Sequence, residues 1–235
     1  MAKPKLALIP AAQGDKFYSV LPSSGVGDFD FSRSGGATRI NSQGLIETVA
    51  SGVSRLNYPL IDGKVVGCPS HLLEPQSTNT LTYSEDFSQW NNLATVTLTS
   101  GQLAPDGTLG ATKISGTLGL SSILLSNTST TATRSIYART VSGTGTARLM
   151  SYYGNTNNLF ILTEEWQRFE LTGSSSIGGV NFYLDFRDNS QTLNEFIIWG
   201  AQSEELSYPT SYIKSNSGSA TTRSAETANN SGDAS

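Results

Sequence analysis

The chain has 235 residues, a formal net charge of −4 and only 14 % charged side chains. This length is sufficient for one large domain with appendages. The weak negative charge argues against nucleic acid or an anionic membrane surface as a partner. With a single cysteine, Cys68, and a single histidine, His71, we expect neither an internal disulfide nor a metal site built from these residue types.

Hydrophobic residues make up 37 % of the chain, because Ser, Thr, Asn and Gly are abundant. This composition favours many short strands joined by turns, as in proteins exposed on particle surfaces. No apolar run approaches the roughly 20 residues of a membrane-spanning helix, so we expect no membrane insertion. The apolar run at 6–10 is shorter than the roughly 7–15 residues of a signal-peptide core, and we expect no export signal.

Residues 1–80 contain few periodic elements and many turn signals, including Asp62-Gly63. We expect short strands at 16–21, 29–32, 38–41 and 45–49. The sequence Asn41-Ser42-Gln43-Gly44 predicts a tight hairpin between the last two. Because this region has too little apolar material for its own large core, it should pack on the rest of the chain, on copies of itself or on a scaffold. We interpret it as an attachment and oligomerisation region.

Residues 81–213 carry strand signatures separated by Gly, Ser, Asn and Asp clusters. The expected strands are 94–99, 111–115, 121–126, 133–140, 145–153, 158–162, 166–172, 179–187 and 194–203. They recur about every 10–15 residues with no amphipathic helix between them, which favours an antiparallel β-sandwich over a parallel α/β sheet. The fold class is therefore all-β.

The strand at 179–187 alternates between apolar and polar residues. Because successive side chains on a strand point to opposite faces, one face should close the sandwich core. Its residues are Val180, Phe182, Leu184 and Phe186. The other face should carry Asn181, Tyr183, Asp185 and Arg187. Three Trp residues in apolar surroundings, Trp90, Trp166 and Trp199, are expected chiefly in the core.

An aromatic ring beside planar polar groups is a pattern typical of sugar binding, since the ring supplies contact area and the polar groups supply orientation. The candidate glycan-binding residues are Asn181, Tyr183, Asp185 and Arg187, joined by Arg148, Tyr152 and Tyr137 if their strands are neighbours. Two alternatives remain open for these rings. They could pack against another subunit, or they could simply cover the outer face of a sheet.

Paired carboxylates could instead indicate a glycosidase. The pairs are Glu85 with Asp86, Glu164 with Glu165, Asp185 with Asp188, and Glu204 with Glu205. Adjacent residues on a strand diverge, and Asp185 and Asp188, an odd number of positions apart, also diverge unless a turn begins between them. We therefore expect no catalytic residues and no enzyme. We also expect no cofactor and no metal. A structural calcium ion would need oxygen ligands such as Asp86, Asn79, Asn91 and Asp106, whose spacing matches no defined calcium loop. Cys68, beside Pro69, should be a buried small apolar residue, and His71 a surface or interface residue.

Residues 214–235 form a Ser, Thr and Asn-rich C-terminal arm that cannot bury enough surface on its own to offset chain entropy. Within it, residues 217–223 echo residues 34–39. The similarity is either chance or a sign that both segments pair with equivalent edges of an assembly.

Several phrases in order along the chain resemble a family of bacteriophage structural proteins, variously head-fibre, tail-fibre or tail components. They include Phe31-Ser32-Arg33-Ser34, Leu72-Leu73-Glu74-Pro75-Gln76, Tyr83-Ser84-Glu85-Asp86-Phe87-Ser88, Ala104-Pro105-Asp106-Gly107-Thr108, Gly200-Ala201-Gln202 and Tyr208-Pro209-Thr210-Ser211-Tyr212-Ile213. The resemblance spans roughly residues 17–225. The central domain of that family is similar to jelly-roll carbohydrate-binding modules. The resemblance therefore implies a jelly-roll β-sandwich at 81–213 behind an extended, irregular N-terminal attachment region.

The function expected from this resemblance is a non-enzymatic structural protein of the virion, assembled in the host cytoplasm. It would form a fibre or decoration on the head or tail and expose its sandwich for adhesion to host or other glycans. Expected partners are copies of itself, first of all in a trimer, and other capsid or tail proteins. The alternatives are a glycan-binding module without a virion role and a polysaccharide depolymerase.

Overall fold

The computed structural model describes residues 11–13, 16–18, 30–93, 96–119, 123–127, 131–151, 159–174, 181–187 and 190–229. Within these ranges the regular structure is antiparallel β, interrupted by one short 3₁₀ helix, η1 (Phe87–Gln89). This confirms the all-β prediction. No helix in the described ranges is long and apolar enough to cross a bilayer.

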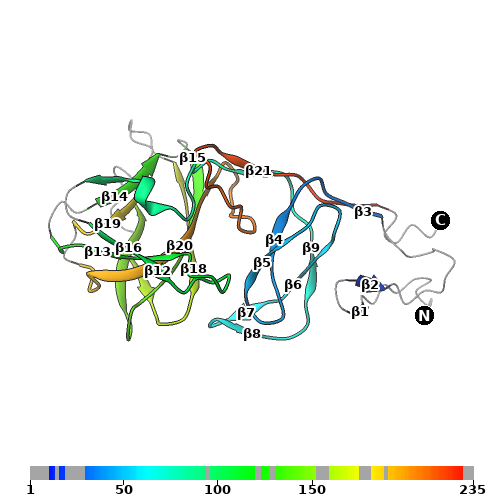
Figure 1. The fold of residues 1–235 in the computed structure, drawn as a ribbon, viewed down its shortest axis with the longest axis horizontal. Coiled ribbons are helices and arrows are strands. Elements are labelled where there is room, and N and C mark those ends of the chain that lie inside the picture. Colours follow the sequence, from blue (N-terminus) through cyan, green and yellow to red (C-terminus); the bar gives the residue numbers. More distant parts are fainter. Residues whose placement is uncertain are drawn as a thin grey trace, which may run out of the picture.

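Two five-stranded sheets form the main body (Figure 1). We call the sheet ordered β11-β14-β19-β16-β17 the free sheet, and the sheet ordered β12-β13-β20-β15-β18 the covered sheet. The free sheet consists of β11 (Asn91–Leu93), β14 (Ile123–Asn127), β19 (Asn181–Asp185), β16 (Gly145–Ser151) and β17 (Leu159–Leu162). The covered sheet consists of β12 (Thr97–Gln102), β13 (Ala111–Ser115), β20 (Glu195–Glu204), β15 (Thr131–Arg139) and β18 (Gln167–Ser174).

The strand pairing identifies the fold as a jelly roll. The consecutive strands β13 to β20 pair from the outside inward, β13 with β20, β14 with β19, β15 with β18 and β16 with β17. The chain thus forms one long antiparallel hairpin, whose strand pairs alternate between the two sheets until the turn from β16 to β17. This arrangement is the jelly-roll topology. Strands β11 and β12 extend the two sheets at their edges.

The inward faces of both sheets form the main hydrophobic core. Phe182 and Leu184 of β19, and Phe186 just after it, are fully buried in this core, as the alternation predicts. The ring of Phe182 meets that of Trp90 edge-on, with the ring centroids 5.4 Å apart. Burying an aromatic side chain of this size contributes roughly 1.5–3 kcal/mol, so these rings are a main source of stability.

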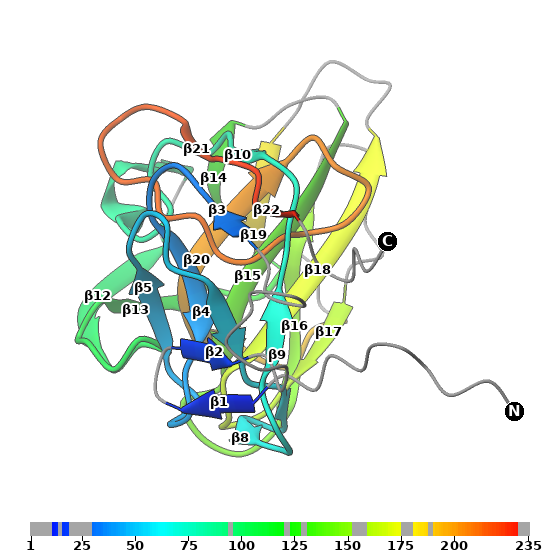
Figure 2. The ribbon, with the colours of Figure 1, turned by 90° about the vertical axis from the view of Figure 1, so that its right-hand side faces the viewer.

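A second, smaller core lies on the outer face of the covered sheet. It consists of Ile46, Ala104, Ala111, Ile197, Trp199 and Tyr212. The Trp199 and Tyr212 rings pack with centroids 4.5 Å apart. Ile46 comes from the N-terminal region, which therefore uses this sheet as the other half of its core. Figure 2 shows the N-terminal strands in front of β15, β18 and β20.

The N-terminal region is a set of short antiparallel pairs. The pairs within it are β1 (Ala11–Gln13) with β2 (Lys16–Tyr18), β4 (Ala37–Ile40) with β5 (Ile46–Val49), β6 (Arg55–Asn57) with β9 (Ser70–Leu72), and β7 (Leu60–Ile61) with β8 (Lys64–Val65). The predicted turn at 41–44 is present, and Oδ1 of Asn41 accepts bonds from the backbone N–H groups of Gln43 and Leu45. Asp62 and Gly63 both have positive φ, as a two-residue hairpin turn between β7 and β8 requires.

The C-terminal segment pairs with the N-terminal region. Strand β21 (Thr221–Arg223) lies against β10 (Ser77–Asn79), and β22 (Thr227–Asn229) lies against β3 (Asp30–Ser32). The two segments that echo each other in sequence have different partners, since β4 pairs with β5 and β21 with β10. The C-terminal segment has too few apolar residues to fold on its own, and it is ordered by backbone pairing with the N-terminal region.

A buried ionic cluster fastens the C-terminal segment in place. It consists of Arg33, Arg55, Glu74, Arg223 and Glu226, which we call the Glu226 cluster. Both Arg33 and Arg55 donate to the Glu226 carboxylate, with Arg33 Nη1 at 2.7 Å from Oε1. Glu74 accepts a hydrogen bond from Arg55 and forms an ion pair with Arg223, and the N···O distance is 2.8 Å in each case. Removing charges from water is costly unless they are paired and hydrogen-bonded, so each member depends on the others.

Candidate functional site

The outer face of the free sheet points away from the N-terminal region (Figure 1). In the strand register, Arg148 of β16 lies opposite Asp185 of β19, and Ser151 lies opposite Tyr183. The guanidinium of Arg187 lies over the Tyr183 ring, 5.5 Å from its centroid. Four of the predicted glycan-binding residues, Tyr183, Asp185, Arg187 and Arg148, therefore come together on this face.

Asp185 is covered by Arg187. Arg187 Nε lies 2.9 Å from Oδ1 of Asp185 and its Nη2 lies 2.5 Å from Oδ2, while the Arg187 backbone N–H also donates to Oδ1. As a result Asp185 is 3 % exposed and Tyr183 9 %, whereas the Arg187 side chain is 46 % exposed. The open row of polar groups expected from the sequence is therefore wrong in one respect: Arg187 folds back and is the group that faces solvent.

Arg148 is a second, more deeply buried cation beside the same carboxylate. Burial lowers the pKa of Arg148, with Arg187 acting in the same direction and Asp185 opposing both. The hydrogen bond to Asp185 raises the pKa of Arg187. Gln191, which the sequence analysis did not single out, accepts from the backbone N–H of Arg148 and donates to the backbone oxygen of Asp185. It holds β16 and β19 together at this point.

A β-bulge shapes the site. The register between β16 and β19 shifts between Arg148 and Ser151, and Met150 has a φ of 56°. Leu149 and Met150 are both fully buried, so two consecutive side chains enter the core. Bulges of this kind redirect the side chains that flank them. Period-two alternation does not reveal such a break, and no other sequence signal marked it.

Of the three remaining predicted residues, one lies elsewhere and the side chains of the other two are not described. Tyr137 lies on β15 in the covered sheet, where its ring packs 5.6 Å from that of Trp199, so its predicted place beside Tyr183 is wrong. Asn181 begins β19, but its side chain lies outside the described part of the structure, and so does Tyr152. Tyr137 is separated from the others because β15 belongs to the other sheet, and the sequence did not reveal which strands share a sheet.

Two of the carboxylates considered for hydrolysis, Glu204 and Glu85, take part in structural contacts. Glu204 is fully buried and accepts from Ser77, Gln202 and Thr210. Glu85 accepts from the Tyr212 hydroxyl and from Lys214. Of the second residue in the pair with Asp185, Asp188, nothing is described.

The oxygen ligands considered for calcium have contacts of their own. The Asn79 amide donates to the backbone oxygens of Ala201 and Ile213, Asp86 caps η1, and Asp106 accepts from Thr108. Asn91 pairs with Leu125 at the edge of the free sheet. The described ranges contain no group of three or more His, Cys, Asp or Glu placed to hold a metal ion.

The single cysteine and the single histidine lie close together in the N-terminal region. Cys68 is exposed, so the expectation of a buried residue is wrong; it stands in the connection before β9 instead of in a core. The His71 ring meets that of Phe31 edge-on at 5.5 Å, and partial burial lowers the pKa of His71.

No protein-family model matches the chain, and no curated protein matches it. Among solved structures, it is similar to the CBM22-1 xylan-binding domain of Xyn10C from Paenibacillus barcinonensis. The identity is 14 % over 57 % of this chain and 94 % of that one, with a TM-score of 0.37. It is also similar to the N-terminal CBM22-1–GH10 modules of the Clostridium thermocellum endo-1,4-β-D-xylanase 10B in complex with xylohexaose. There the identity is 13 % over 55 % of this chain and 28 % of that one, with a TM-score of 0.34. The jelly-roll assignment rests on strand pairing instead.

Proposed function

We propose that this chain is a non-enzymatic structural protein of a bacteriophage virion, a fibre or decoration on the head or tail. This role follows from the resemblance of several phrases, in their order along the chain, to phage structural proteins. In the proposal, the N-terminal region and the C-terminal segment attach the protein to its neighbours in the particle. The jelly roll projects outward and contacts glycans of the host or the surroundings.

The observation that supports the proposal most is that the molecule has two different ends. Strand β3, near the start of the chain, pairs with β22, near its end. This pair and the free sheet lie at opposite ends of the molecule (Figure 1). A protein anchored at the β3–β22 end would therefore present the free sheet at its far end. Such a layout suits a projecting component.

The proposal includes assembly into a homo-oligomer, with a trimer as the first candidate, since projecting fibres commonly use cyclic symmetry. Some apolar residues of the N-terminal region are already covered within one chain and so do not require a second copy. Ile46 is buried in the second core and Phe31 packs against His71, so these apolar groups have partners within one chain. Leu45 remains 38 % exposed and available for contact between copies.

An electron-microscopy map of intact particles tests this role. We expect density for the chain on the head or tail surface, with the β3–β22 end toward the particle and the jelly roll outward. The symmetry of that density would give the copy number. Absence of the chain from purified particles, or a jelly roll buried in the particle wall, would contradict the proposal.

For adhesion, we propose the free-sheet face that contains Tyr183 and Arg187. Arg187 offers an exposed guanidinium for sugar hydroxyls or acidic groups, held in place by Asp185 beneath it. A weak site of this kind gains strength from repetition, because linked copies raise avidity by about 10²–10⁴-fold without new contacts.

We expect Arg187→Ala and Tyr183→Ala each to weaken binding to a glycan array at least about tenfold, a loss of about 1.4 kcal/mol. Lys113→Ala is the matched control, because it also removes one positive charge but lies on β13 of the covered sheet. Binding that survives both substitutions would place the glycan site elsewhere. Release of reducing ends from a host polysaccharide would instead favour a depolymerase.

A further inference from the structure

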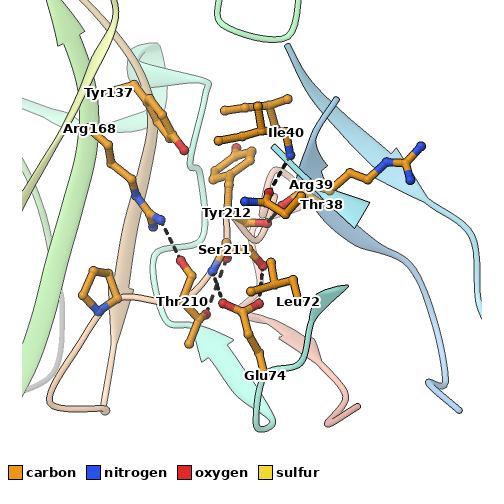
Figure 3. Close-up of a pocket in the computed structure, with 13 residues that line it drawn as sticks. Thr38, Arg39, Ile40, Leu72, Glu74, Tyr137, Arg168, Thr210, Ser211 and Tyr212 are labelled. Atoms are coloured by element: carbon orange, nitrogen blue, oxygen red, sulfur yellow. Dashed lines mark hydrogen bonds between the residues drawn. The ribbon is translucent and has the colours of Figure 1, made fainter. Parts of the chain in front are cut away.

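A cavity of about 220 Å³ lies between the N-terminal region and the covered sheet (Figure 3). Arg168 and Tyr137 form its jelly-roll wall, and Thr38, Ile40 and Leu72 of the N-terminal strands are on the opposite side. The cavity is smaller than the roughly 300–1,000 Å³ of sites for drug-sized ligands. It therefore suits a ligand about the size of one sugar ring.

Arg168 is a cation without a carboxylate partner among the described residues. Its Nη1 donates to the backbone oxygen of Thr210 at 2.7 Å, and its Nη2 donates to the Ser135 hydroxyl at 2.8 Å. Both acceptors are neutral. Its Nε is buried and meets no acceptor within the described ranges. Glu170, on the same face of β18, is exposed to solvent.

The other charged groups lining the cavity are already neutralised. Arg39 pairs with Glu47 at 2.6 Å. Glu74 is bound by Arg55 and Arg223, and it also accepts from the Ser211 backbone N–H. Among the charged residues that line the cavity, Arg168 is therefore the one that could bind an anionic ligand.

Tyr137 adds a hydroxyl beside that charge. The two residues lie opposite each other in the register of β15 and β18, and the Arg168 guanidinium lies 5.5 Å from the Tyr137 ring centroid. Figure 3 shows the Tyr137 hydroxyl directed toward the cavity, and no acceptor for it is found in the described part of the chain. Burial raises the pKa of Tyr137, so the hydroxyl keeps its proton and can donate.

We propose that this cavity binds one acidic sugar unit, a uronic-acid ring whose carboxylate meets Arg168 and whose ring oxygen or hydroxyl meets Tyr137. The side chains of Ile40 and Leu72 provide apolar contact for the C–H surface of the ring. The site is separate from the free-sheet face, so this proposal can be tested independently of the adhesion surface proposed above. Because both walls contribute, a bound ligand would also hold the N-terminal region against the jelly roll.

The test is isothermal titration calorimetry and thermal unfolding of the full chain with glucuronate, glucose and N-acetylglutamate. We expect glucuronate to bind at least tenfold more tightly than the other two and to raise the melting temperature, since a ligand specific to the folded state stabilises it. Tyr137→Phe and Arg168→Gln should each weaken glucuronate binding at least tenfold. Lys113→Ala, which removes one positive charge on β13 outside the cavity lining, should leave it unchanged.

Each contrary result has a definite meaning. No glucuronate binding at about 10 mM, a free energy weaker than about −3 kcal/mol, would overturn the proposal. Equal binding of glucose would exclude the carboxylate contact, and equal binding of N-acetylglutamate would exclude the sugar ring. Tyr137→Phe keeps the ring and removes a hydroxyl with no described acceptor, so it tests the site even if Arg168→Gln fails to fold.

Discussion

Replacing Glu226 by glutamine is expected to lower the free energy of unfolding by about 3–5 kcal/mol, the usual cost of breaking a buried ion pair from one side. The substitution keeps the shape of the side chain but leaves Arg33 and Arg55 with a neutral partner in a buried place. It also weakens the acceptor for the backbone N–H of Glu74. Urea denaturation of the full chain at neutral pH measures the change.

Glu47→Gln is the matched control, because Glu47 pairs with Arg39 nearer the surface, where its side chain is 36 % exposed. Surface pairs of this kind contribute about 0–1 kcal/mol. If both substitutions had equally small effects, the Glu226 cluster would not be what fastens the C-terminal segment.

Acid should release the same cluster. Burial alone would raise the pKa of Glu226, but hydrogen bonds from Arg55 and Arg33 outweigh it and hold the pKa below its ordinary value of 4.5. Burial would also raise the pKa of Glu74. The charge of Arg223 and the hydrogen bond from Ser211 outweigh this effect, so the pKa of Glu74 is lowered as well.

A carboxylate with a lowered folded-state pKa stabilises the fold at pH values above its unfolded pKa, and this contribution is lost as the pH falls through the folded value. We therefore expect the free energy of unfolding to fall from about pH 4.5 downward, and to fall less steeply in Glu226→Gln. Urea titrations at several pH values across that range measure how steeply the free energy of unfolding changes with pH in the unsubstituted chain and in Glu226→Gln. Identical slopes would show that Glu226 does not titrate with unfolding.

The jelly-roll strands were predictable because their signal is local. Residues 111–115 and 194–203 were expected as strands, and β13 and β20 occupy 111–115 and 195–204. The signal in β20 is a continuous apolar run that is buried on both faces of the covered sheet. The short strands β6 to β10, β21 and β22 were not predicted, since two or three residues show no periodicity and their order comes from distant partners. In the C-terminal arm the only pointer was charge: Arg223 and Glu226 stand out in a segment of Ser, Thr, Asn and Ala.

The candidate site was predictable only in part, for a related reason. Alternation identifies which residues of β19 share a face, but not what covers that face. Tyr183 and Asp185 share the face opposite to Phe182, yet both are buried because Arg187 and Arg148 lie beside them. These contacts depend on one side chain folding back and on the register of β16. Sequence alternation specifies neither.

Phe182→Ala is expected to destabilise the protein by about 3–5 kcal/mol, the range for removing a buried aromatic ring from a core. Phe182 is fully buried, and its ring packs against the ring of Trp90 in an edge-to-face arrangement. Its loss would leave a cavity between the two sheets, since neighbours held in sheet pairing relax only partly. Chemical denaturation followed by Trp fluorescence reports both the stability and the environment of Trp90.

Ile161→Ala is the control on the same sheet, because Ile161 lies on β17 with 65 % of its surface exposed. A surface substitution of this kind should change stability by no more than about 0.5 kcal/mol. The contrast tests the sandwich directly, since both residues are large, apolar and on strands of the free sheet, and differ in which way they face. Equal losses from the two substitutions would mean that β17 also buries its outer face, against a partner copy. That outcome would make the edge of the free sheet a place where copies of the chain meet.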